Sequence, residues 1–334
     1  ALAITCVAYI ISVSKRWQML AIGCCVVVLT SVAIDLRDYI NRIHPGAVIS
    51  KVDASFMTPM EIVAVYAYHR PRKSTERLPP RIYRRLYQSG YSPIGLGHRR
   101  ESVVGAVGAA YASAKHKALV IGAGSGRTAG AAALVFDAVD VVDISANTVP
   151  LLEYLGAENF SLRSKAHVRI LRMDGVLAPR LLEEKYDLVI LTTDPSFLQK
   201  AAKLYYKESL QALGGLLNPG GVLVFWADST VGHRGAQILV NTARDIFQYQ
   251  KLFSMTSQPQ SLSYFLLVNS DEPLVYDPDR WRLLETFIND SRVQHALTDG
   301  EHKRLISGRY HSTQQIHSLR LPALDVLVDQ SGEL

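Results

Sequence analysis

The sequence predicts an α/β fold built on a mainly parallel sheet that ends in an antiparallel hairpin, and three observations lead to this prediction. From residue 118 onward, short and nearly continuous apolar runs alternate with helix-forming segments, which is typical of a parallel sheet buried on both faces. The first run leads through a glycine-rich turn into a helix. The last two runs follow each other with no room for a helix between them, as in a hairpin.

The individual elements follow from these runs. A helix is expected over 101–114, and further helices near 127–136, 147–156, 176–184, 200–216 and 233–246. Parallel strands are expected at 118–123, 138–144, 167–173, 186–192 and 221–227, and the hairpin at 250–257 and 263–269. The run NPGG at 218–221 predicts a turn that ends one helix and starts the fifth strand. Five parallel strands with such a hairpin are typical of the class I methyltransferase fold, and dinucleotide-binding folds do not end this way.

The turn after the first strand predicts a nucleotide site. Gly122, Gly124 and Gly126 allow backbone N–H groups to approach a ligand closely, and Asp143 ends the second strand 21 residues after Gly122. An acid at about this distance accepts hydrogen bonds from ribose hydroxyls. The pattern G-x-G-x-G differs from the G-x-G-x-x-G of dinucleotide sites and favours an adenosyl–amino-acid ligand over a pyrophosphate.

Polar residues follow the other strands as well. Ligands of open α/β sheets bind beyond the carboxyl ends of the strands. The residues expected there are Asp174 and Gly175 after the third strand, Thr192, Thr193, Asp194 and Pro195 after the fourth, and Asp228 after the fifth. A single aspartate after a strand is often only a helix N-cap. Because polar residues follow several successive strands, a ligand site is favoured over separate helix caps. We expect Asp174 to bind the adenine amino group in this site.

The first 35 residues differ from the rest. Residues 1–13 and 18–34 are apolar and are joined by a short connection at 14–17, which predicts two transmembrane helices in a hairpin over 1–35; a buried helical hairpin of a soluble protein is the alternative. The first segment starts at residue 1, as expected if further chain precedes it. Cys6, Cys24 and Cys25 all lie in these segments without metal-ligand spacing, so we expect no metal site.

Residues 36–100 are predicted to be a basic juxtamembrane linker, in which the apolar run 61–68 is expected to form a strand or a short helix. Lys and Arg far outnumber acids over 69–100, and a basic segment beside a membrane typically contacts anionic headgroups. Contact with a partner protein and a plain solvated surface remain open. No nucleic-acid-binding motif accompanies the charge, so nucleic acid is not an expected partner. Residues 101–270 are the expected α/β domain, and 271–334 an extension with a helix around 279–290.

The segments ALVIGAGSGRTAG, VDVVDIS, VRILRMDG, YDLVILTTDP and LLNPGGVLVF, in this order, resemble the spermidine synthase-like (polyamine aminopropyltransferase) family of the class I methyltransferase fold, over roughly residues 95–270. The whole chain resembles bacterial proteins that fuse a membrane region to such a domain. The resemblance implies binding of S-adenosylmethionine or its decarboxylated form, and true synthases transfer an aminopropyl group to a diamine. The implied ligand-binding residues are Gly122, Gly124, Gly126, Asp143, Asp174 and Gly175.

The chain departs from the family at the fourth strand. The synthases carry Asp-x-x-Asp-Pro there, and the first acid helps to deprotonate the attacking amine. Here Leu191 takes its place, and leucine cannot accept a proton. Asp194 keeps the second acid and is the predicted catalytic carboxylate. The family's acid-and-tyrosine segment before the glycine loop is replaced by HRRE at 98–101, in which only Glu101 corresponds.

Three functions therefore stay open. The first is a membrane-anchored spermidine synthase-like protein that binds the adenosyl ligand and transfers an aminopropyl group to a small polyamine. The second is a methyltransferase that uses S-adenosylmethionine. The third is a non-catalytic scaffold subunit of a membrane protein complex, in which case no cofactor is needed. Because the ligand is made in the cytosol, we expect the large domain to face the cytoplasm from the bacterial inner membrane.

Overall fold

The computed structural model describes residues 48–58, 61–69, 82–88, 94–96, 100–193, 202–228, 232–254 and 264–282. The predicted transmembrane hairpin, residues 1–35, and most of the predicted C-terminal extension lie outside these ranges. Within them, no helix is both long and apolar enough to cross a bilayer. The chain forms two compact units, residues 1–52 with 66–83, and residues 53–65 with 84–334.

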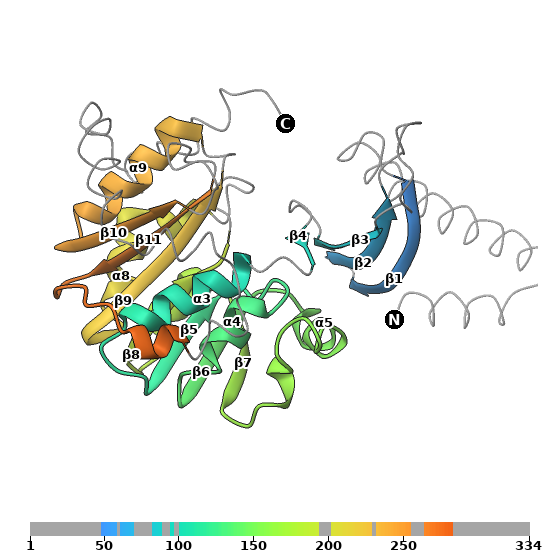
Figure 1. Ribbon diagram of the computed structural model, residues 1–334, viewed down its shortest axis with the longest axis horizontal. Helices are drawn as coiled ribbons and strands as arrows, with labels where there is room; N and C mark the ends of the chain where they lie inside the picture. Colours follow the sequence, from blue (N-terminus) through green and yellow to red (C-terminus); the bar gives the residue numbers. More distant parts are fainter. Residues whose placement is uncertain are drawn as a thin grey trace, which may run out of the picture. The chain divides into compact units, whose positions relative to one another are not determined.

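The second unit is built on a seven-stranded sheet with the strand order β10-β11-β9-β8-β5-β6-β7 (Figure 1). The strands are β5 (Lys117–Ile121), β6 (Ala138–Asp143), β7 (Val168–Arg172), β8 (Tyr186–Leu191), β9 (Leu217–Asp228), β10 (Tyr249–Ser254) and β11 (Tyr264–Ser270). The first five are parallel, and β11 is antiparallel to both β9 and β10. The predicted parallel sheet with a closing antiparallel hairpin is confirmed.

Helices cover both faces of this sheet. They are α3 (Arg100–Tyr111), α4 (Arg127–Ala132), α5 (Thr148–Tyr154), α6 (Ala178–Leu181), α8 (Lys207–Gly214) and α9 (Gly232–Arg244), with short 3₁₀ turns η1 (Leu162–Ser164), η2 (Gly175–Leu177) and η3 (Lys203–Tyr205). Residues 278–282 are also helical and begin the helix predicted around 279–290. The helices α3 and α4 pack on one face, and α8 and α9 on the other.

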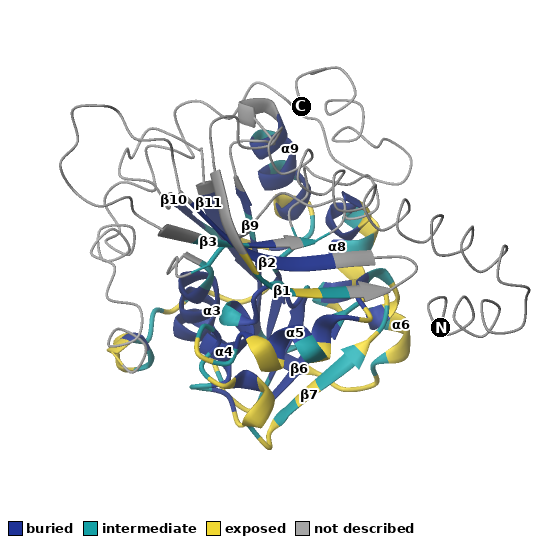
Figure 2. Ribbon diagram, turned by 90° about the vertical axis from the view of Figure 1, so that its right-hand side faces the viewer, coloured by how far each residue is buried: buried dark blue, intermediate teal, exposed yellow. Residues whose placement is uncertain are grey.

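The central strands are buried on both faces, as their near-continuous apolar sequence predicts. In β5, Ala118 and Val120 belong to the apolar cluster under α3 and α4, whereas Leu119 and Ile121 belong to the cluster under α8 and α9. All four side chains are at most 2% exposed. Figure 2 shows this burial in dark blue through β6 and α3, and shows the edge strand β7 as intermediate and exposed.

The turn predicted at 218–221 lies inside strand β9. Strand β9 begins at Leu217, and its pairing with β8 shifts register between Leu217 and Val222. Gly220 has a φ of +69°, which favours glycine, and the Asn218 side chain donates to Asp187 Oδ1 on β8 at 2.7 Å. The sequence signal NPGG therefore marks a bulge in a longer strand and not the loop before it.

A second sheet occupies the stretch predicted to be a basic linker. Its strands are β1 (Val48–Thr58), β2 (Glu61–His69), β3 (Ile82–Gln88) and β4 (Ile94–Gly95), in the order β1-β2-β3-β4. In β2, residues 63–68 are buried, consistent with the β-branched and aromatic content of this run. The run 61–68, expected to be a strand or a short helix, lies in β2. It belongs to a sheet that the linker prediction did not include.

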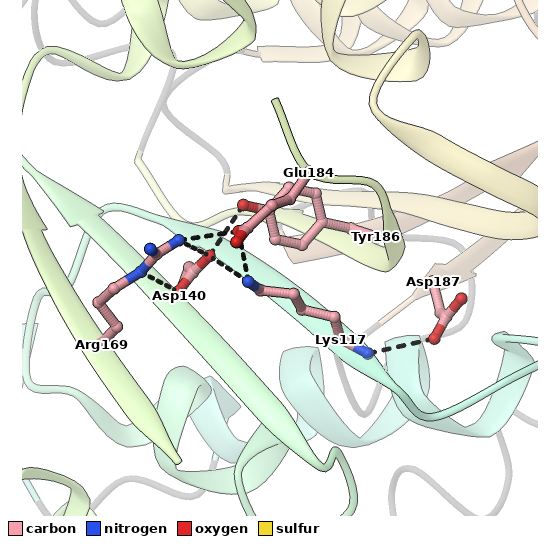
Figure 3. A network of polar contacts seen from close by, with 6 residues as sticks. All are labelled: Lys117, Asp140, Arg169, Glu184, Tyr186 and Asp187. Atoms are coloured by element: carbon pink, nitrogen blue, oxygen red, sulfur yellow. Dashed lines mark hydrogen bonds and ion pairs between the residues drawn. The ribbon is translucent and has the colours of Figure 1, made fainter. Parts of the chain in front are cut away.

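A charged network holds the sheet at the amino ends of its parallel strands (Figure 3). Its centre is Asp140 of β6, whose side chain is 3% exposed. Arg169 of β7 donates two hydrogen bonds to it at 2.8 Å, and Tyr186 of β8 donates one at 2.8 Å. Burial alone would raise the pKa of Asp140, but these bonds and Lys117 of β5 hold it below its ordinary value. Two ion pairs and a hydrogen bond from Tyr186 therefore join four neighbouring strands at this end of the sheet.

Candidate functional site

The predicted glycine loop forms at the carboxyl end of β5 and leads into α4. Gly122, Gly124 and Gly126 have φ angles of +94°, +51° and +82°, in the left-handed region that glycine enters at little cost. A Cβ at residue 122 would lie 2.6 Å from Thr192 Oγ1, and one at residue 126 would lie 2.5 Å from Leu152 Cδ2. Both the backbone conformation and the available space therefore require glycine at residues 122 and 126, and at residue 124 the backbone conformation favours it.

Two backbone donors of this loop are left for a ligand. The N–H of Gly122 donates to Val142 O at 2.8 Å, and that of Gly126 to Ala123 O at 2.7 Å. In the part of the chain that the structure describes, the N–H groups of Gly124 and Ser125 have no acceptor. Donors that are open at the carboxyl end of a strand fit a ligand with oxygen or nitrogen acceptors.

Asp143 joins the loop to the end of β6. Its Oδ2 accepts from the N–H of Ala123 at 2.7 Å, and its Oδ1 accepts from the N–H of Ser145 at 2.8 Å. Burial raises the pKa of Asp143, although these two bonds and one from Thr148 act in the opposite direction. A carboxylate has about four acceptor sites, so Asp143 keeps capacity for a ribose hydroxyl while it holds the loop.

Asp174 lies at the end of the next strand, β7. It is exposed, and its Oδ1 accepts from the N–H of Val176 at 3.0 Å as the N-cap of η2. Among the described residues Asp174 makes no hydrogen bond to the glycine loop, so only a bound ligand would connect the two. Gly175 is buried, and a Cβ there would lie 2.4 Å from Ile121 Cγ2. Gly175 thus has a packing role independent of ligand binding.

Hydrogen bonds connect the carboxyl end of β8 to the ends of the neighbouring strands β5 and β9. Thr192 donates to Ile121 O at 3.0 Å and also to Gly122 O, and Trp226 Nε1 donates to Thr192 O at 3.1 Å. The side chain of Leu191 is fully buried in the apolar cluster under α8 and α9. The predicted catalytic Asp194, with Pro195, lies outside the described residues, and nothing is described of the Asp228 side chain.

Glu101 of α3 is the site residue that sequence reasoning pointed to least clearly. Its Oε2 accepts a hydrogen bond from Ser125 Oγ of the glycine loop, and its backbone carbonyl accepts from Thr128 Oγ1 at 2.8 Å. Burial, with a smaller contribution from Glu158, raises the pKa of Glu101 to about 7 against the opposing effects of Ser125 and Arg127. In the sequence, this acid looks like an ordinary first-turn partner of the helix dipole.

Arg127, the first residue of α4, makes its hydrogen bond and its ion pair with residues other than Glu101. Its Nε donates to Ser102 Oγ at 2.7 Å, and its guanidinium pairs with Glu158 at 3.3 Å. Glu158 is also paired with Arg84 at 3.3 Å. The positive charge of Arg127 is therefore paired with the carboxylate of Glu158.

The fold and the loop define a class of protein, the α/β proteins of the methyltransferase type. Within that class, the chain has the fold of the spermidine synthases. It is similar to a spermidine synthase in complex with the transition-state analogue AdoDATO, with a TM-score of 0.58 at 15% identity, over 77% of this chain and 89% of that one. It is also similar to the spermidine synthase from Thermotoga maritima, with a TM-score of 0.55 at 14% identity, over 77% and 88%. Neither a protein-family model nor a curated protein sequence matches the chain.

Proposed function

We propose that the chain binds an adenosyl ligand, S-adenosylmethionine or its decarboxylated form, at the carboxyl ends of β5, β6 and β7. The observation that carries the proposal is the glycine loop itself. It is fixed to Asp143 through the N–H of Ala123, and it leaves the N–H groups of Gly124 and Ser125 open. Asp143 would accept from the ribose hydroxyls and Asp174 from the adenine amino group. The spermidine synthase fold supports this choice of ligand.

Two exposed apolar side chains support a ligand with a flat base. Ile144 follows Asp143 directly and is 63% exposed, and Leu177 lies three residues after Asp174 and is 43% exposed. Large apolar side chains exposed at the end of a parallel sheet gain from covering the face of an aromatic ring. Their positions beside the two predicted ligand-binding acids favour adenine as that ring.

We further propose that the activity is aminopropyl transfer to a small polyamine, with Asp194 as the carboxylate that receives the amine proton. The bound donor would supply an electrophilic carbon next to a sulfonium. The protein would contribute the orientation of donor and amine and a proton acceptor. The described end of β8 offers threonines in place of carboxylates, so Asp194 is the acid nearest in sequence for this role.

A non-catalytic scaffold subunit is the second candidate, and Leu191 favours it. Its side chain lies in the apolar core, where a carboxylate would be costly to bury. The strand end that carries the first acid of the synthases is therefore used here for packing. In this reading the membrane segment at 1–35 would dock the chain in a membrane protein complex.

Calorimetry on the full chain, purified in detergent, tests the binding proposal. We expect S-adenosylmethionine, its decarboxylated form or 5′-methylthioadenosine to bind, and Asp143→Ala to weaken binding about tenfold or more without loss of fold, since a hydrogen bond to a charged group is lost. If none of the three binds at millimolar concentration, the site is not an adenosyl site and the scaffold reading stands.

An activity assay separates the enzyme from the scaffold. With decarboxylated S-adenosylmethionine and putrescine, we expect formation of methylthioadenosine that is abolished by Asp194→Asn. Binding without any product formation would favour the scaffold. Transfer of a methyl group from S-adenosylmethionine to an added acceptor would favour the methyltransferase instead.

A further inference from the structure

The glycine loop contacts two carboxylates, one toward each end. Asp143 accepts from the N–H of Ala123, and Glu101 accepts from the hydroxyl of Ser125. The two open N–H groups, of Gly124 and Ser125, lie between these contacts in the chain. A ligand that is held by the open donors therefore lies within reach of a second acid, on α3, that the ribose does not require.

The charge of Glu101 is not balanced by the protein. Among the described lysines and arginines, none forms an ion pair with it. Arg127 of α4 is near enough to lower the pKa, but its guanidinium is held by Glu158 and Ser102. Glu158, which follows α5, raises the pKa in turn. A partly buried carboxylate with a single hydroxyl partner is stabilised when a cation approaches it.

We propose that Glu101 recognises a positively charged group, a sulfonium or an ammonium, on the adenosyl ligand. This inference rests on the proposed function, because it requires that the ligand lies along the glycine loop. It assigns to Glu101 the discrimination between cationic ligands and their neutral analogues, with Asp143 left to the ribose. Ser125 then positions the carboxylate by donating its hydroxyl to Oε2.

A simple ordering role for Glu101 is the competing explanation. In that case the Ser125–Glu101 bond only fixes the loop, and loss of the charge affects every adenosyl ligand alike. The pair decarboxylated S-adenosylmethionine and 5′-methylthioadenosine separates the two explanations. Both contain adenosine, but only the first carries positive charge. The ratio of their affinities therefore reports on the charge and not on the loop.

The experiment measures both affinities by calorimetry on the wild-type chain and on the variants Glu101→Gln and Glu183→Gln. In Glu101→Gln we expect the preference for the cationic ligand to fall about tenfold or more, as for the loss of a charge-assisted contact. The affinity for methylthioadenosine should change by less than about twofold. Glu183→Gln is the control. It removes an exposed acid just before β8, at the amino ends of the parallel strands and so opposite to the glycine loop, and it should leave the ratio of affinities unchanged.

The pH profile of the wild-type chain provides a second readout, which does not require that the Glu101→Gln variant folds. Because the cation selects the ionised carboxylate, affinity for the decarboxylated ligand should fall about tenfold per pH unit below pH 7, and affinity for methylthioadenosine should stay flat. Ser125→Ala removes a bond that lowers this pKa, so the midpoint should move to higher pH.

Four outcomes would overturn the inference. Equal weakening of both ligands in Glu101→Gln would show an ordering role, and unchanged affinities for both ligands would show that Glu101 does not meet the charge. If the wild-type chain binds methylthioadenosine but has no preference for the cationic ligand at pH 8, Glu101 recognition fails while the adenosyl site stands. If the chain binds neither ligand, the proposed function fails and this inference fails with it.

Discussion

At the scale of single residues, Glu101 links the stability of the ligand-free protein to pH. Its pKa rises from 4.5 to about 7 in the folded state. Between these values the unfolded chain has already lost the proton that the folded protein keeps, so stability falls as pH rises through this window. Below pH 4.5 the contribution is fully present, and above pH 7 it is lost.

Urea unfolding of wild type and Glu101→Gln at pH 5 and pH 8 checks this prediction. We expect the wild type to lose roughly 2–3 kcal/mol relative to the variant between the two pH values, because each unit of pKa difference corresponds to about 1.4 kcal/mol. The partial exposure of Glu101 argues for the lower part of this range. A difference that does not vary with pH would show that Glu101 is ionised throughout.

Gly175 gives a prediction about packing. In Gly175→Ala the new Cβ would lie 2.4 Å from Ile121 Cγ2, and overpacking of this kind costs about 1–3 kcal/mol. We expect urea unfolding to show that loss. Gly156→Ala is the matched control, because the nearest atom to its Cβ would be Glu153 O at 3.4 Å. Equal effects of the two substitutions would contradict the packing role.

The residues of the site differ in how well the sequence predicted them. The three loop glycines were predictable, because a positive φ and a close approach have few other solutions. The contact of Glu101 with the loop was not, because it depends on the packing of α3 against α4, and sequence separation hides it. The ligand roles of Asp143 and Asp174 stay predictions.

At the scale of elements, we expect the charged network of β5 to β8 to make a measurable contribution to the free energy of unfolding. Asp140→Asn leaves Arg169 and Lys117 without their shared buried partner. We expect a loss of about 3 kcal/mol, since breaking a buried pair costs about 3–5 kcal/mol and the arginine is half exposed. Glu184 is 46% exposed, and Glu184→Gln should cost less than about 1 kcal/mol. Chemical denaturation measures both, and similar losses would contradict the central role of Asp140.

The sequence also predicted elements unequally. The apolar runs located β5 to β8 to within about two residues, because burial on both faces leaves little choice of residue type. The bulge in β9 was missed, and of the sheet of β1 to β4 only the run 61–68, in β2, was expected to be a strand or a short helix. In both cases local signals, a Pro-Gly pair and an excess of charge, pointed to irregular structure, and pairing with a neighbouring strand overrode them.

At the scale of the whole molecule, the proposed membrane anchor makes a prediction about the intact chain. We expect the full chain to stay in the membrane pellet after an alkaline carbonate wash, and a chain that lacks residues 1–35 to be released. Asp143→Ala in the full chain is the control and should stay in the pellet. Release of the full chain by the wash would show that residues 1–35 do not anchor it.

The position of β11 in the sheet has a consequence for folding during translation. Although β11 is the last strand of the sheet, it lies between β9 and β10 and pairs with both. Strand β10 is thus synthesised before the strand that connects it to the rest. During translation, which adds about 5–20 residues per second, the side of β9 that receives β11 stays unpaired until residue 270 has emerged. The nascent chain therefore exposes an open strand edge, a target for chaperones, until almost the whole described domain has been made.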